Sequence, residues 1–103
     1  MSNNDVVSLH AHPIHETVRL PDGRETVIRV GIPEDSYIAD RDLNTVVLEL
    51  RSGRTVLAVV TTILNADQES AARRLADRVA EGLRSGELEP HASALGPLAD
   101  EIL

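Results

Sequence analysis

The alternation of apolar and polar residues predicts antiparallel strands in the first two-thirds of the chain. Within residues 44–64, two β-rich runs flank Ser52-Gly53, a pattern typical of a hairpin with a two-residue turn. The first run alternates apolar and mostly polar residues, as a strand covered on one side does. The second run, residues 55–64, is apolar at nearly every position and is expected to lie deeper. It would place Val56, Ala58, Val60 and Leu64 on one side and Leu57, Val59 and Ile63 on the other.

A second hairpin is predicted upstream, from residues 16–20 and 25–32. Its turn is Pro21-Asp22-Gly23. Proline presets φ at the first turn position, aspartate bonds nearby backbone and glycine supplies the positive φ that ends the turn. In the second arm one face carries Thr26, Ile28, Val30 and Ile32, and the other carries Glu25, Val27 and Arg29.

Helical spacing begins after Leu64. Asn65 and Gln68 fit a capping box, and Gly86 is a natural terminator for a helix that runs to about Arg84. The apolar stripe of this helix is alanine-rich and consists of Ala72, Leu75, Ala76, Val79 and Leu83. A short final helix is expected from about Pro97, because proline fits the first turn of a helix.

This order of elements predicts an α+β fold, in which two antiparallel β-hairpins form a four-stranded sheet. The long amphipathic helix and the short C-terminal helix would lie on one face of that sheet. With 103 residues the chain is expected to be a single domain. Residues 1–14 are interpreted as a flexible N-terminal arm, in which Pro13 interrupts a weak strand pattern.

Composition narrows the classes of partner. Ten arginines and no lysine stand against 17 acidic residues, for a formal net charge of −7. An acidic chain without a basic cluster lacks the features of a nucleic-acid binder, and the same argument opposes docking on an anionic membrane. The start of the sequence has no secretory signal pattern, and no run is long enough to span a membrane, so a cytoplasmic location is expected.

Candidate chemistry is concentrated near the N-terminus. The chain has no cysteine, which excludes disulfides, thiolate nucleophiles and cysteine-ligated zinc. On a strand His10 and His12 would point to the same face, with His15 or Glu16 as a third ligand, so zinc or another divalent transition metal is one interpretation. The competing interpretation is three solvated histidines on a mobile arm, with no cofactor.

An acidic segment gives a second, weaker metal pattern. Asp40, Asp42 and Asn44 resemble the first three ligands of a calcium loop, but Thr45 stands where that loop needs glycine and Arg51 where it needs glutamate. A solvated acidic loop is favoured. Ser52 lies in no nucleophile elbow, and there is no glycine-rich phosphate loop, so the sequence gives little support for an enzyme.

Two functions follow from these patterns. The favoured one is a non-catalytic interaction or regulatory protein that associates with a protein partner or with itself, as a homodimer. Two helices can cover only one side of the sheet, so Leu57, Val59 and Ile63 need another cover, which is either the N-terminal arm through Val6, Val7 and Leu9 or a second copy of the chain. The second copy is preferred, because the arm is short and Pro13 limits its pairing. The outward residues that would form the interaction surface are Val27, Val47, Val59 and Thr61. The alternative is a metal-binding protein or metal-dependent enzyme that uses His10, His12 and His15.

Overall fold

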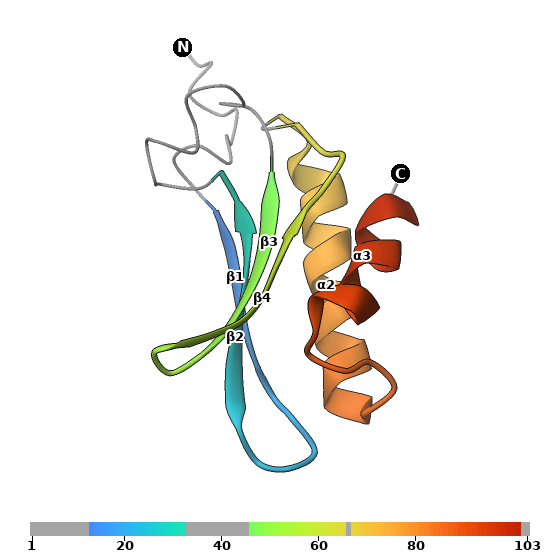
Figure 1. Cartoon of the computed structure of the whole chain (residues 1–103). Helices are drawn as coiled ribbons and strands as arrows, with labels where there is room; N and C mark the ends of the chain where they lie inside the picture. The colour runs from blue at the N-terminus through green and yellow to red at the C-terminus, as the bar shows by residue number, and fades with distance from the viewer. Residues whose placement is uncertain (1–12, 33–45, 66, 102–103) are drawn as a thin grey trace.

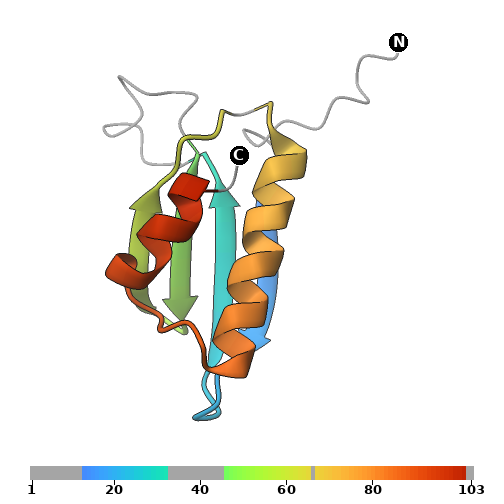
Figure 2. The same ribbon diagram turned by 90° about the vertical axis from the view of Figure 1, so that its right-hand side faces the viewer.

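The computed structural model describes residues 13–32, 46–65 and 67–101. It contains four strands and two helices, in the order β1 (Ile14–Arg19), β2 (Glu25–Gly31), β3 (Val47–Ser52), β4 (Thr55–Thr61), α2 (Glu69–Ser85) and α3 (Ala92–Glu101). The strands form one antiparallel sheet in the order β1-β2-β3-β4. Both helices lie on the same side of this sheet (Figures 1 and 2), with α2 over β1 and β2 and α3 over β4. The α+β fold predicted from the sequence is confirmed.

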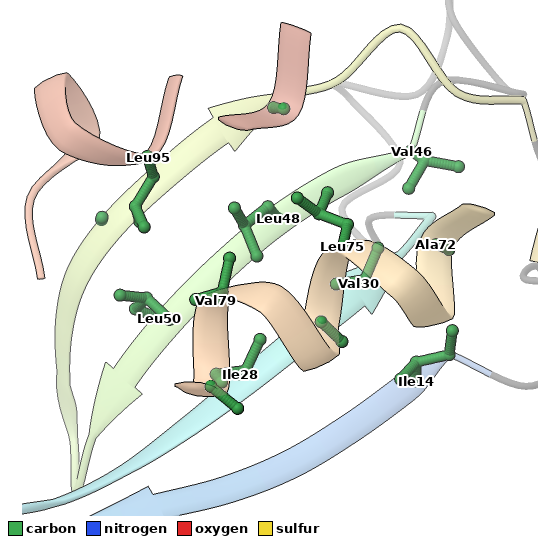
Figure 3. Packing of buried hydrophobic residues seen from close by; sticks show 14 of the residues in the cluster. Ile14, Ile28, Val30, Val46, Leu48, Leu50, Ala72, Leu75, Val79 and Leu95 are labelled. Carbon is green, nitrogen blue, oxygen red and sulfur yellow. The ribbon is translucent and has the colours of Figure 1, made fainter. Parts of the chain in front are cut away.

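The core is a layer of aliphatic side chains between the sheet and the helices (Figure 3). The predicted alternation is confirmed in β2 and β3, because Thr26, Ile28, Val30, Leu48 and Leu50 are all fully buried. Helix α2 adds its predicted stripe of Ala72, Leu75, Ala76, Val79 and Leu83, and α3 adds Leu95 and Ala99. Small alanines let α2 approach the sheet closely, so a core without a single phenylalanine or tryptophan still closes.

The first hairpin has the predicted turn. Gly23 N–H donates to the Leu20 carbonyl at 2.9 Å, and Gly23 adopts a φ of +96°. Asp22 accepts hydrogen bonds from the backbone N–H of Arg24 at 3.0 Å and from its guanidinium at 2.9 Å. The backbone bond from Arg24 is the main cause that holds the pKa of Asp22 below 3.8. Asp22 and Gly23 therefore act as their chemistry predicts.

The turn of the second hairpin is one residue later than predicted. Ser52 pairs with Thr55 at the ends of β3 and β4, so the two turn residues are Gly53 and Arg54 rather than Ser52-Gly53. Gly53 has a φ of +60° and Arg54 has no positive φ. Glycine at the first of the two positions is typical of a type II′ turn, whose twist matches that of the flanking strands.

The predicted faces of β4 are wrong at two positions. Leu50 pairs with Ala58 and Arg51 with Val56, so Leu57 is an extra residue that forms a β-bulge. The bulge reverses the alternation, and Val56 joins the face opposite the helices while Leu57 packs against the core. The regular strand also ends at Thr61 instead of Leu64, where the Thr62 hydroxyl donates to the Val46 carbonyl at 2.8 Å.

Both helix starts differ from the sequence prediction. Gln68 does reach back, since its side-chain oxygen accepts from Asn65 N–H at 2.7 Å, but these residues form a separate turn and α2 begins at Glu69. Helix α3 begins at Ala92, five residues before Pro97, because the His91 carbonyl accepts from the N–H groups of Ala94 and Leu95. The end of α2 is as predicted, next to Gly86, whose N–H donates to Leu83.

Candidate functional site

The side of the sheet away from the helices is the candidate site, and we call it the open face. It is formed by alternate residues of the four strands. The register places on it His15, Thr17 and Arg19 of β1, Glu25, Val27 and Arg29 of β2, Val47, Glu49 and Arg51 of β3, and Val56, Val59 and Thr61 of β4. Within residues 13–32, 46–65 and 67–101, no segment lies over this face (Figures 1 and 2).

Apolar side chains are concentrated on the open face at the β4 side. Among the described residues the exposed large hydrophobic residues are Val27 (37% exposed), Val56 (45%), Val59 (55%) and Ile63 (51%). Val27, Arg51 and Val56 are neighbours across β2, β3 and β4, and Val59 lies beside Glu49. Ile63 follows the end of β4. The sequence correctly predicted Val27, Val47, Val59 and Thr61 as outward residues, and it missed Val56 because alternation alone does not reveal a bulge.

Charges on the open face are mixed. Three arginines and two glutamates lie there, so its formal charge is +1, while the whole chain carries −7. Arg51 forms an ion pair with Glu49 at 3.0 Å, and Arg19 lies 3.4 Å from Glu25. Exposed pairs of this kind add little stability. Their effect is to leave the open face without a strong field of one sign, so that a like-charged partner is not repelled from it.

The two edges of the sheet differ in chemistry. Strand β1 follows Pro13 and contains His15, Glu16 and Arg19, and Glu16 points toward the helices. Its carboxyl group is beside Asp77 of α2. The hydrogen bond between these two groups, together with burial, raises the pKa of Glu16 above 4.5, although Arg73 and Arg84 oppose the shift. Prolines, charges and an inward-pointing charged residue are features that protect an edge strand from pairing with another chain.

Strand β4, at the other edge, has no proline and no charge, and its one protective feature is the bulge at Leu57. Residues 55–65 contain no charged residue, no proline and no glycine. Among the described residues, β4 pairs only with β3. We call its other side the free edge. An uncharged strand rich in β-branched residues, with unpaired backbone groups along one side, is a template for pairing with another strand.

The histidine site can be followed only in part. His10 and His12 lie outside the described residues, and so do Tyr37, Asp40, Asp42 and Asn44. His15 is exposed on the open face, directly opposite Arg29 on β2. The described part of the chain brings together no group of three potential metal ligands. The Arg29 guanidinium donates to the Ile32 carbonyl at 2.9 Å. The metal interpretation stays a prediction.

Two further findings bear on the class of protein. No helix in residues 67–101 is long and apolar enough to cross a membrane. Comparison with models of known protein families, with curated proteins and with solved structures finds no match for this chain. The function must therefore be argued from the surface described above.

Proposed function

We propose that this protein is a non-catalytic interaction module that associates with a second copy of itself through its sheet. The observation that carries the proposal is the position of the exposed apolar side chains. Val27, Val56 and Val59 lie on the open face, and Ile63 adjoins it at the end of β4. A sheet with one free face is usually polar there, as alternation of core and solvent residues requires. This one carries Val27, Val56 and Val59 as exposed side chains next to Arg51 and Glu49, and exposed apolar residues gathered on one face indicate an interaction surface.

A second copy is the occupant that fits this surface best. The mixed charges of the open face allow two chains of the same net charge to approach, since each copy offers both arginines and glutamates at the contact. Twofold pairing of one patch with itself is also the commonest way in which soluble proteins bury such a surface. Neither argument depends on the histidine arm, so metal binding remains a separate prediction.

The test is the molar mass of the purified chain in solution. Sedimentation equilibrium or light scattering at micromolar concentration should give the mass of two chains. Val59→Lys should weaken the association at least tenfold, because it places a charge among the exposed valines. Ser70→Lys is the matched control, since it adds the same charge at an exposed position of α2 and should leave the dimer intact. A monomer mass for the unaltered chain would sink the proposal.

A further inference from the structure

We infer that two copies join through the free edges of their β4 strands, in antiparallel orientation, to form one continuous eight-stranded sheet. This inference rests on the proposed self-association and specifies its geometry. It assigns the contact to backbone hydrogen bonds along β4, whereas two copies could otherwise stack their open faces against each other.

The backbone of β4 presents hydrogen-bonding groups at the free edge. Thr62 N–H donates to the Val46 carbonyl of the neighbouring segment at 3.0 Å. In an antiparallel ladder every second residue bonds to the same neighbour. Ala58 and Val60 therefore bond toward β3, and Val59 and Thr61 direct their N–H and C=O groups to the free edge. A partner strand there would satisfy both residues.

The pattern of β4 is compatible with pairing to itself. Val59 and Thr61 share the open face, while Ala58 and Val60 face the helices. Consider a twofold axis that passes opposite residue 59, 60 or 61. It pairs backbone groups at the free edge of one copy with backbone groups at the free edge of the other, and it keeps the two open faces on the same side of the joined sheet. No charge lies along the contact on either copy. The valines of the two open faces would then form one apolar strip across the axis.

The charged groups near β4 lie beyond its two ends. Arg54 lies in the turn at one end of β4. Helix α3 covers β4, and its C-terminal end, with Asp100 and Glu101, lies toward the other end of the sheet (Figures 1 and 2). Antiparallel pairing brings the turn of each copy to the end of the sheet where α3 of the other copy ends. Figure 1 shows this turn on the side of the sheet away from the helices, so Arg54 lies outside the backbone contact, and the uncharged pattern of β4, which matches itself, favours a second copy of the chain.

Proline substitution separates edge pairing from face stacking. Thr61→Pro removes an N–H group that points to the free edge and that β3 does not use, so the fold should tolerate it. Thr17→Pro is the matched control. Leu20 N–H donates to the Arg24 carbonyl, so every second residue of β1 before it also bonds to β2. Thr17 lies between two such residues, so its N–H points away from β2, at the outer edge of β1. Both positions lie on the open face, so the two variants differ only in the edge they alter.

We expect the unaltered chain and Thr17→Pro to be dimers, and Thr61→Pro to be a monomer or to dimerise at least tenfold more weakly with an unchanged far-UV circular dichroism spectrum. A dimer of folded Thr61→Pro would overturn the edge geometry and leave self-association standing. A monomer of the unaltered chain would overturn both proposals.

Cysteine cross-linking decides the geometry even if Thr61→Pro does not fold. The chain has no cysteine, so single substitutions at Val59, Val60 and Thr61 give disulfides without background. Residues opposite one another across an antiparallel pair have Cα atoms about 4.5–5.5 Å apart, within the range of a disulfide. One of the three variants should form a covalent dimer on mild oxidation, and Thr17→Cys should not. Equal cross-linking at Thr17, or none along β4, would contradict the inference.

Discussion

Replacing Leu75 by alanine tests how α2 is held to the sheet. Leu75 is completely buried and projects from α2 into the core near Val30 and Leu48 (Figure 3). The substitution removes the equivalent of three methylene groups, at about 0.8 kcal/mol each, or roughly 2.4 kcal/mol of transfer free energy. A residual cavity adds to this cost, because β-branched neighbours such as Val30 are stiff and collapse poorly around a void. We expect a total loss of about 3–4 kcal/mol.

The assay is denaturation followed by far-UV circular dichroism, since the chain has no tryptophan to report by fluorescence. All variants should be compared at one protein concentration, because self-association would make the apparent stability concentration-dependent. A loss of about 3 kcal/mol corresponds to a fall in melting temperature of roughly 12–24 °C for a domain of this size. Arg74→Ala, at an exposed neighbouring position of the same helix, should change the free energy of unfolding by less than about 0.5 kcal/mol. Comparable losses from both variants would refute the assignment of the helix faces.

Three further predictions address the turn, the core and the pH dependence. Gly23→Ala should lower the free energy of unfolding by about 1 kcal/mol, measured by urea denaturation, because the site has open space but a φ of +96°. Thr26→Val should raise it by about 1 kcal/mol in the same assay, because the buried Thr26 hydroxyl has no hydrogen-bond partner among the described residues. Glu16 has a raised pKa in the fold, so its contribution to stability is present below pH 4.5 and is lost as the pH rises through the folded-state value. Thermal melts across this range should show that loss in the unaltered chain and not in Glu16→Gln; an identical profile in both would count against the contact with Asp77.

Most of the fold could be predicted from local chemistry. The pairing of β1 with β2 follows from a turn whose three residues each have a definite backbone preference. The faces of β2 and β3 follow from strict alternation, and the stripe of α2 follows from helical spacing. Each of these features depends on residues within a few positions of one another, so a local sequence pattern is enough to predict it.

The starts of the two helices could not be predicted in the same way, whereas the end of α2 at Gly86 could. Pro97 was expected to mark the start of α3, because proline fits the first turn of a helix. In the structure the helix begins at Ala92, five residues earlier, and this places Leu95 and Ala99 in the core beside β4. The packing of these two residues in the core therefore outweighs the preference of proline for the first turn of a helix. Likewise the bonds between Asn65 and Gln68 close a turn without starting α2.

The bulge at Leu57 explains both the main error in the sequence prediction and the character of the candidate surface. Val56 and Val59 are three residues apart, so in a regular strand they would point to opposite faces. The extra residue brings both to the open face, beside Arg51 and Glu49 of β3. Leu57 is turned toward the core instead, so the strand loses no core contact by exposing Val56. A β-bulge is a local change in backbone pairing that leaves little trace in composition. The apolar surface on which the proposed function depends is thus a product of the pairing of β3 with β4, and hydrophobic alternation alone cannot predict it.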